Sequence, residues 1–505
     1  MSDKREKKIR TSPPPNREQQ GAKPDVEAPG DLQMPPEEML DLAHRVAEHL
    51  VERIGKLPQD NAWEGEFRQV LDDQFLEEPP EDGRSATEVI DKAAHDILPY
   101  SMRLDHPRCF GFVPSSPTWP GVLADFMAAG YHVNQCTWLV ASGPSHLELV
   151  VIDWFRRWIG YPEGAGGLLT SGGSAASLDA FVAAREAMGH PERATVYMSD
   201  QSHSALPRAS IIVGIRRDCI RTIASDEHFR MDMDALARQV AEDRAAGFTP
   251  IAVAANAGTT STGAIDRLEE MAEFCEAEGL WLHVDAAYGG FAIVTEQGKR
   301  LLRGIERADS IGLDAHKWFF QPYEVGCLLA KDENTLKRAF AIHPDVLQDT
   351  IWGKDHPNFA DYGLQLSRSF RALKIWMSVQ TFGMAAFRRA VSKGMELSAQ
   401  AEEYVRASPI LEAMNIVSLG IVCFRVNPAD EDLDEEALDK VNRTVLARMF
   451  WDDRAFMSST MLRGQFVLRM CIVNYATTWD DVRETLEAVE RFGKDALSKA
   501  GQSST

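Results

Sequence analysis

A strand, a glycine-rich turn and a helix follow one another in residues 167–188, which begin Gly167-Leu168-Leu169-Thr170-Ser171-Gly172-Gly173-Ser174. The first four residues form a short apolar run typical of a buried strand, and residues 178–188 have the apolar spacing of a helix. Glycines allow the backbone to turn tightly and approach a ligand, and a helix N-terminus favours an anion. The stretch predicts a strand–turn–helix unit that can bind an anion, although many such turns bind nothing.

The same alternation continues along the chain from about Trp119 to Lys374. Short apolar runs that end in polar residues recur at 194–198, 251–255 and 280–284, with helix-like segments between them. This pattern predicts an α/β fold with a mostly parallel central sheet and helices on both faces. Functional residues in such sheets gather at the carboxyl ends of the strands.

Different patterns flank this region. Residues 34–118 carry apolar positions at helical spacing and predict an N-terminal helical segment, which needs another subunit or the chain's own core as a partner surface. Residues 375–495 predict a small α+β C-terminal domain, from apolar runs at 416–426 and 466–470 and a helix-like stretch at 480–492. Residues 119–374 form the large predicted domain. Residues 1–33 are predicted to be a disordered tail and residues 496–505 a flexible one.

Composition narrows the possible partners and the compartment. The 505 residues carry 54 Lys+Arg against 76 Asp+Glu, a formal charge of −22, which disfavours nucleic acid and anionic membrane as partners. The seven cysteines are scattered singly without metal-ligand spacing, which predicts reduced packing residues and no metal site. No run of 18 apolar residues and no signal-peptide pattern is present, so a cytoplasmic location is expected.

Lys317 and Asp285 are the strongest candidates for chemistry. Lys317 lies in Asp314-Ala315-His316-Lys317-Trp318, whose apolar neighbourhood suits an amine neutral enough to form a Schiff base. Asp285 ends the apolar run 280–284 and suits a buried carboxylate that keeps a pyridine nitrogen protonated. One predicted helix (296–307) and one strand (310–313) separate them, so neighbouring strand ends can present both. This pair is what a protein supplies to use pyridoxal phosphate as a cofactor.

Three further residues follow predicted strands. His203, in the segment 199–205, can stack on a flat ring and donate a hydrogen bond, or cap a turn. Thr260, in the hydroxyl-rich segment 257–263, can bind the cofactor or serve as ordinary turn chemistry. Ala287 is small enough to leave space for a ring.

As a set, these motifs resemble the group II pyridoxal-phosphate decarboxylases, which include the aromatic-L-amino-acid, histidine and glutamate decarboxylases. The resemblance covers roughly residues 35–490. It implies the fold-type I transferase architecture, an obligate homodimer with 34–118 as a dimerisation segment, and decarboxylation of an L-amino acid, with an aromatic side chain expected. The residues that carry the resemblance are His106-Pro107, Gly173-Ser174, residues 199–203, 258–260, 283–288 and 316–318, and a C-terminal signature at 462–469.

The resemblance also implies a role for each candidate. Lys317 would form the Schiff base, Asp285 would pair with the ring nitrogen, and His203 would stack on the ring and contact the substrate carboxylate. The implied catalytic residues are Lys317 and His203, and the implied cofactor-binding residues are Gly173, Ser174, His203, Thr260, Asp285, Ala287, His316 and Lys317.

Two positions depart from the family pattern. Asp314 stands where the family commonly has an asparagine near the phosphate, and a second anion there is unfavourable unless it is screened or points elsewhere. Val346 stands where the aromatic decarboxylases have a loop tyrosine that protonates Cα. Relatives without this tyrosine form aldehyde, ammonia and peroxide, so an aldehyde synthase is the alternative to an amine-forming decarboxylase. His343 is a candidate replacement for the missing acid.

The sequence also leaves alternatives for the residues of the substrate pocket and for the class of protein. Phe112, Trp119 and Trp138 are candidates for an aromatic pocket or for plain core, while Val113 and Cys136 stand where bulkier rings are expected. A catalytically silent scaffold of the same fold is the third hypothesis. The joint presence of Lys317, Asp285 and His203 disfavours it.

Overall fold

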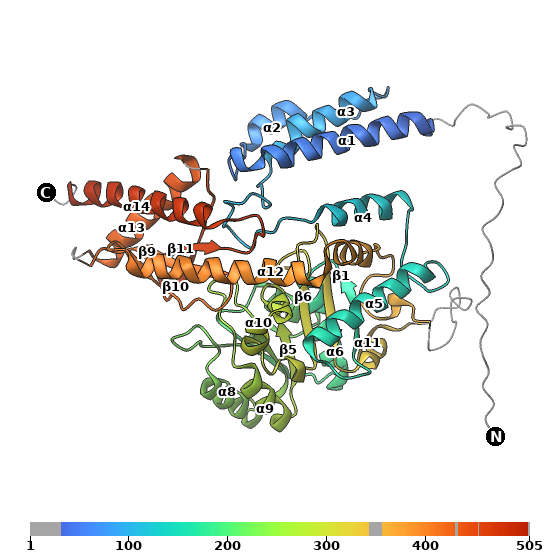
Figure 1. Ribbon diagram of the computed structural model, residues 1–505. Helices are drawn as coiled ribbons and strands as arrows, with labels where there is room; N and C mark the ends of the chain where they lie inside the picture. The colour runs from blue at the N-terminus through green and yellow to red at the C-terminus, as the bar shows by residue number, and fades with distance from the viewer. Residues whose placement is uncertain (1–31, 343–355, 430–432, 453, 503–505) are drawn as a thin grey trace, which may run out of the picture. The chain divides into compact units, whose positions relative to one another are not determined.

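The computed structural model describes residues 32–342, 356–429, 433–452 and 454–502, and the chain divides into two compact units (Figure 1). The first unit comprises residues 1–55 and 76–98. Its described elements are α1 (Pro36–Lys56), α3 (Ala86–Lys92) and a π-helical turn, η2 (Ala93–Ile97). Asp91 joins α3 to α1 through ion pairs with Arg45 and with His49, whose Nε2 is 2.9 Å from Asp91 Oδ1.

This first unit has little core of its own. None of the residues in α1 or α3 is buried, and Met39, Leu40 and Val51 on α1 are more than half exposed. An amphipathic helix gains most of its stability by packing its apolar face against a partner. The expected N-terminal helical segment is present, and its apolar faces leave room for a partner surface.

A seven-stranded sheet forms the centre of the second unit, residues 56–75 and 99–505. Its strand order is β1-β7-β6-β5-β4-β2-β3. The pairs β2–β3, β2–β4, β4–β5 and β5–β6 are parallel, and β7 is antiparallel to both neighbours, which confirms the mostly parallel sheet. The strands are β1 (Gly166–Thr170), β2 (Ala194–Ser199), β3 (Ile220–Ile223), β4 (Thr249–Asn256), β5 (Trp281–Asp285), β6 (Ser310–Asp314) and β7 (Gly326–Ala330).

Helices cover both faces of this sheet, as expected. The connection from β2 to β3 leads toward the β3 edge of the sheet, whereas the connections from β3 to β4 and from β4 to β5 lead away from that edge. Because such crossovers are right-handed, the helix in the first connection and the helices in the other two lie on opposite faces of the sheet. One face carries α6 (Gly173–Ala187), α7 (Ala205–Ile212) and α11 (Glu333–Phe340). The other carries α5 (Ser142–Ile159), α8 (Met233–Ala245), α9 (Leu268–Glu278), η5 (Gly290–Val294) and α10 (Glu296–Leu301). Residues 250–256 of β4 are all buried, as expected for a strand in a sheet that helices cover on both faces.

Two element boundaries differ from the sequence prediction. Helix α6 begins at Gly173, five residues before the periodic run, because the glycine turn itself forms the first helical turn. The helix expected over 296–307 is interrupted after Leu301. Gly304 has φ +94°, and a Cβ there would lie 2.5 Å from the backbone nitrogen of Glu269, so the chain turns out of the helix at this point.

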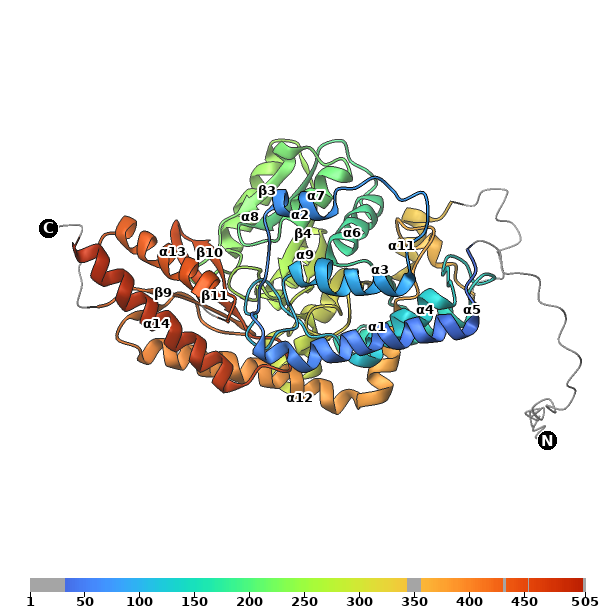
Figure 2. The same ribbon diagram turned by 90° about the horizontal axis from the view of Figure 1, so that it is seen from above.

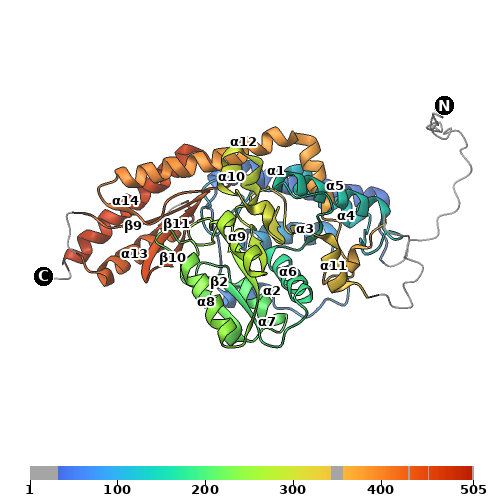
Figure 3. The ribbon, with the colours of Figure 1, turned by 90° about the horizontal axis from the view of Figure 1, so that it is seen from below.

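A smaller antiparallel sheet lies at one end of the second unit (Figure 2, Figure 3). Its order is β10-β11-β9-β8, and it packs with two helices, which confirms the predicted small α+β layer. These elements are β8 (Leu411–Ala413), β9 (Ile421–Val426), β10 (Ser458–Leu462), β11 (Gln465–Cys471), α13 (Glu435–Asp452) and α14 (Trp479–Gln502). Helix α14 continues past residue 495, where the flexible tail was expected, because Ala496 and Leu497 remain buried in its core.

The long helix α12 (Ala372–Ala407) packs against both layers, touching α5 near the large sheet and β8, β9 and α14 in the small one. It bends at Gly383, whose φ of +70° and ψ of 154° are not helical. The remaining elements are α2 (Arg68–Phe75), α4 (Trp119–Gly130) and the 3₁₀ turns η1 (Leu57–Gln59), η3 (Leu98–Tyr100), η4 (Arg217–Cys219), η6 (Ile305–Arg307) and η8 (Phe359–Asp361).

The predicted domain boundaries at 118/119 and 374/375 stay predictions, and the tail expected over 1–33 lies outside the described residues up to residue 31. None of the described helices combines the length and the apolar character that crossing a membrane requires.

Candidate active site

One cavity of about 340 Å³ lies at the carboxyl ends of the parallel strands. The loops after β1, β2, β4, β5 and β6 all reach it, as the topology of the sheet requires. The structure brings every predicted site residue into its lining: Gly173, Ser174, His203, Thr260, Asp285, Ala287, His316 and Lys317.

The turn after β1 has the geometry of an anion site. A Cβ on Gly173 would lie 3.0 Å from the Cβ of Ala287, so only a bare backbone fits the space beside the cavity. The carbonyl of Gly172 accepts the N–H groups of Ala175 and Ala176, both at 3.0 Å, and so starts α6. The first N–H groups of this 15-residue helix have no acceptor within the helix, and with the helix dipole they favour a phosphate.

Lys317 lies at the centre of the cavity in an ion pair. Its Nζ is 2.9 Å from Asp314 Oδ2. Burial lowers the pKa of Lys317, but the carboxylates of Asp314 and Asp285 outweigh burial, and the pKa is raised above its ordinary value. The contact with Asp314 therefore favours the charged amine, whereas the sequence shows both residues but not their contact.

Asp285 ends β5, and its Oδ1 accepts the N–H of Ala287 at 3.1 Å. Burial raises the pKa of Asp285 above its ordinary value, while Lys317 and the Ala287 amide act in the opposite direction. A cation placed against this carboxylate would favour its charged form. The site can therefore stabilise a protonated ring nitrogen.

His203 stands between β2 and α7, with its side chain exposed toward the cavity. Its Nδ1 accepts the N–H of Ala205 at 3.2 Å, so the neutral ring carries its proton on Nε2. His316, by contrast, is buried, its Nδ1 lies 2.9 Å from the carbonyl oxygen and 3.1 Å from the nitrogen of Val325, and burial lowers its pKa. Of the two imidazoles, His203 is the one free to meet a ligand.

Several residues of this cavity were missed in the sequence. Asn256 ends β4 and faces Asp285 across the strand pair, and its Nδ2 donates to Asp266 Oδ2 at 2.9 Å. Tyr288 stacks on Trp318 with ring centroids 5.6 Å apart. Tyr323 and Glu324 also line the cavity. Asn256 could have been found as the polar residue that ends an apolar run, whereas Tyr323 and Glu324 follow no strand and carry no such signal.

A second cavity of about 410 Å³ continues from the first, since both include His203, Thr260, Tyr288, Lys317 and Tyr323. Its remaining lining consists of apolar side chains, hydroxyl-bearing side chains and one arginine: Leu104, Phe112 and Val113, then Ser261, Ser458, Ser459 and Thr460, and Arg469. A small molecule that bonds to Lys317 can extend into this second cavity.

Arg469 lines this cavity as a cation whose hydrogen-bond donors are mostly taken by the protein. Its guanidinium donates to the carbonyls of Phe112 at 2.7 Å, Thr260 at 2.8 Å and Ser261 at 3.1 Å, and to Ser458 Oγ at 3.2 Å. The arginine therefore ties three separate segments together, and most of its donors are used by the protein itself.

Two aromatic residues predicted for a substrate pocket lie elsewhere. Trp119 lines a separate apolar cavity with Phe320 and Phe387, and Trp138 packs edge-on against His146 and His356. Neither tryptophan appears in the described lining of the two cavities that include Lys317. Cys136, expected at the same pocket, is absent from the described lining. Phe112 and Val113 do line the pocket.

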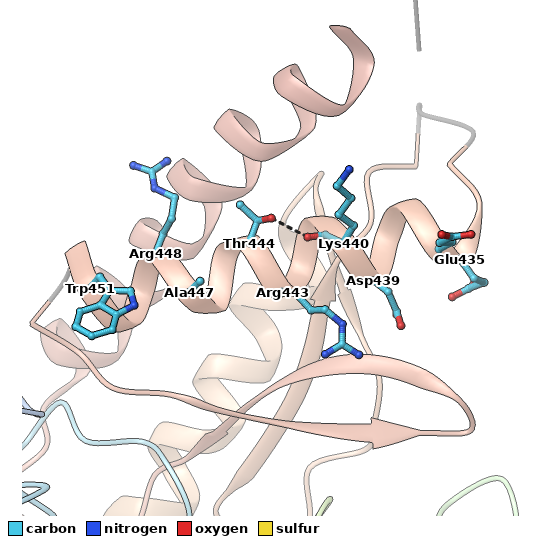
Figure 4. Close-up of a pocket in the computed structure, with 9 residues that line it drawn as sticks. Glu435, Asp439, Lys440, Arg443, Thr444, Ala447, Arg448 and Trp451 are labelled. Carbon is cyan, nitrogen blue, oxygen red and sulfur yellow. Dashed lines mark hydrogen bonds between the residues drawn. The ribbon is translucent and has the colours of Figure 1, made fainter. Parts of the chain in front are cut away.

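A further groove of about 890 Å³ is not part of this site. It runs along α13, where the acidic Glu435 and Asp439 are followed by the basic Lys440 and Arg443, and Trp451 is 66% exposed (Figure 4). All nine of its lining residues come from one helix, which is typical of a solvated face. In the described part of the chain, no group of three or more His, Cys, Asp and Glu side chains is placed to hold a metal ion.

Comparisons with known proteins agree with this geometry. Residues 68–427 match the model of the pyridoxal-dependent decarboxylase conserved domain. The chain is 36% identical over 468 residues to the aromatic-L-amino-acid decarboxylase of Bacillus atrophaeus, covering 92% of this chain and 97% of that one. It is 29% identical over 435 residues to phenylacetaldehyde synthase of Arabidopsis thaliana, covering 83% and 88%. The crystal structure of Oryza sativa TDC with PLP and tryptamine has the same fold, with TM-score 0.87, 24% identity and coverage of 92% and 99%.

The protein belongs to the family of pyridoxal-phosphate-dependent amino-acid decarboxylases, and its cofactor is pyridoxal phosphate. The cavity fits this group, because the bare glycine turn leaves room for a phosphate and Lys317 lies between the turn and Asp285. The loop residues His343 and Val346 lie outside the described residues.

Proposed function

We propose that the protein decarboxylates an aromatic L-amino acid to the corresponding amine and CO2. The observation that carries this proposal is the convergence of the glycine turn, Lys317, Asp285 and His203 on one cavity that continues into a second one with apolar and hydroxyl-bearing side chains in its lining. Bound pyridoxal phosphate supplies an aldehyde for attachment and a ring that accepts the electron pair released when the carboxylate leaves.

Each residue has a physical task in this proposal. Lys317 Nζ would be the amine that holds the cofactor, and Asp285 would keep its ring nitrogen protonated. The N–H groups at Gly173 and Ser174 would hold the phosphate. His203 would contact the ring and offer the N–H of Nε2 to the substrate carboxylate. Ala287 and Thr260 would leave space for the ring, and His316 would support the turn that carries Lys317.

The second cavity supports a neutral substrate side chain. Leu104, Phe112 and Val113 offer apolar contact, and the Arg469 donors are bound by backbone carbonyls. A buried acidic side chain would need free hydrogen-bond donors as well as a cation, and most donors of Arg469 are already used. The described lining favours an aromatic substrate over glutamate or aspartate.

An aldehyde synthase is the second candidate. Val346 at the position of the family's loop tyrosine favours it, and so does the similarity to a phenylacetaldehyde synthase. Assays of CO2, amine, aldehyde and peroxide from aromatic, acidic and branched L-amino acids separate the two. We expect CO2 and amine in equal amounts from aromatic substrates. Aldehyde and peroxide in place of amine would favour the synthase, and no CO2 from any of these substrates would refute both.

We further propose that the protein is a homodimer. Helix α1 exposes apolar side chains, and so do α4 and the segment after it. Such patches mark association surfaces. On α4 and the segment after it these side chains are Leu123, Phe126, Met127, Tyr131, Leu139 and Val140. Light scattering on the purified protein tests this, with a mass near twice 56.2 kDa expected.

A cytoplasmic location is likewise our proposal. It is supported by the seven cysteines, all of which are free, as expected in a reducing compartment. Cell fractionation tests it. The charge of −22 supports a small-molecule partner over nucleic acid.

A further inference from the structure

Asp314 places a carboxylate directly beneath the turn proposed for the phosphate. It ends β6 and its side chain is 2% exposed. A Cβ on Gly173 would lie 3.1 Å from Asp314 Oδ2, and one on Gly172 would lie 3.8 Å from Oδ1. The carboxylate therefore touches both glycines of the turn.

The two oxygens of Asp314 differ in their partners. Oδ2 is 2.9 Å from Lys317 Nζ. Oδ1 is buried and accepts no hydrogen bond from any residue that the structure describes. A buried carboxylate oxygen normally has a donor, and leaving one without a partner is unfavourable. The missing partner of Oδ1 points to a group that enters the site.

The charges around Asp314 are unbalanced. Lys317 carries the fixed positive charge nearest to it, and burial lowers the pKa of His316, whose Nε2 is 3.7 Å from Oδ2. Asp285 and Glu324 line the same cavity, and no arginine appears in its described lining. The titratable or charged groups that face Asp314 are Lys317 and His316 from its own turn, Asp285 from β5, Cys327 from β7 and Tyr323 from the segment before β7.

A phosphate monoester adds to this imbalance. Its second pKa is about 6, so it carries nearly two negative charges above neutral pH. The N-terminus of α6 favours one anion, and here two would compete for it. An asparagine at position 314 would avoid the conflict by donating from its amide. An aspartate can donate only when it is protonated.

We propose that the cofactor phosphate binds together with one additional proton, shared between Asp314 Oδ1 and a phosphate oxygen. The proton comes from solvent, Oδ2 continues to accept from Lys317, and the new O–H···O contact supplies the partner that Oδ1 lacks. This inference rests on the proposal that the turn at residues 171–175 binds the phosphate. It does not depend on the substrate.

Calorimetry with pyridoxamine 5′-phosphate tests the inference without turnover, because this amine cannot condense with Lys317. Binding is measured near pH 8, about two units above the phosphate pKa, in buffers of different ionisation enthalpy. We expect the wild type to take up about one proton more per ligand than Asp314→Asn. Because binding takes up this additional proton, the affinity of the wild type for pyridoxamine 5′-phosphate should fall as pH rises. Over roughly pH 7–9 the fall per pH unit should be about tenfold larger than in Asp314→Asn.

Lys317 needs its own control, because the substitution also removes its counter-ion. In Lys317→Arg the cation stays charged at all accessible pH values. We expect the one-proton difference that Asp314→Asn produces to persist in the Lys317→Arg background. Ser174→Ala should weaken binding without changing the proton count. Equal uptake by wild type and Asp314→Asn, or a difference that disappears with Lys317→Arg, overturns the inference.

If Asp314→Asn does not fold, the wild type alone can still test whether the phosphate binds with an additional proton. Pyridoxamine lacks the phosphate, so we expect its binding to take up about one proton fewer than that of its 5′-phosphate. Equal uptake would refute the shared proton while leaving the phosphate site intact. If the phosphate adds no affinity at all, the proposed phosphate turn fails, and the inference about Asp314 fails with it.

Discussion

Removal of the Arg368 side chain should destabilise the second unit strongly, because it would leave Glu148 buried and uncompensated. Arg368 Nη2 is 2.6 Å from Glu148 Oε1, and the two side chains are 1% and 0% exposed. Arg368 also donates to the carbonyl of Leu169 at 2.7 Å, one residue before the end of β1. Breaking a buried pair by removing one partner costs about 3–5 kcal/mol.

The structure sets where in this range the effect should fall. Glu148 would keep two donors, the N–H of Leu169 and Nε2 of Gln135, both at 2.7 Å. We therefore expect Arg368→Met to lower the free energy of unfolding by about 3 kcal/mol, near the lower end of that range. Adding Glu148→Gln removes the charge but keeps an acceptor, and should restore about 2 kcal/mol of this loss.

Urea-induced unfolding followed by tryptophan fluorescence measures these differences at a fixed protein concentration, since association shifts apparent stability. Arg389→Met on the exposed side of α12 is the matched control and should stay within about 0.5 kcal/mol of wild type. The reasoning is refuted if Arg368→Met behaves like Arg389→Met, or if the double variant is no more stable than Arg368→Met.

Three further predictions concern the cofactor site and pH. Lys317→Ala should abolish the borohydride-stable attachment of cofactor, with Lys299→Ala, an exposed lysine on α10, as the control; retained attachment would exclude Lys317. Gly173→Ala should weaken cofactor binding at least tenfold in an absorbance titration, because its Cβ would lie 3.0 Å from that of Ala287; unchanged affinity would contradict the tight turn. Burial raises the pKa of Asp179 to about 7, so its folded form binds a proton that the unfolded chain releases from about pH 4 upward. Stability should thus fall as pH rises from about 4 to 7, and Asp179→Asn should flatten this dependence in thermal melts; a parallel pH profile in both proteins would refute it.

Local motifs were sufficient to predict which residues would gather in this cavity. Asp285 ends a strand, Lys317 and His203 follow strands, and a parallel sheet brings strand ends together whatever the details of packing. The mostly parallel sheet and the small antiparallel layer followed from the same periodicity. These features depend on residues that are close in sequence or on topology alone.

The substrate pocket was not predictable in this way. Its walls come from residues 104–113, 261 and 458–469, and they meet only because the two sheets dock. Trp119 and Trp138 are as aromatic as Phe112, and no sequence pattern reveals that their side chains point elsewhere. The sequence also does not show whether burial or the carboxylate of Asp314 has the larger effect on the pKa of Lys317, because the two act in opposite directions and only distances decide between them.

The bonds of Arg469 link distant parts of the chain around the second cavity. The match to the family model ends at residue 427, whereas Ser458, Thr460 and Arg469, which line the second cavity, lie beyond it on β10 and β11. Arg469 also holds the carbonyls of Phe112 and Thr260. A change in this hairpin would therefore reach the loop that carries Thr260, beside Lys317, and not the second cavity alone.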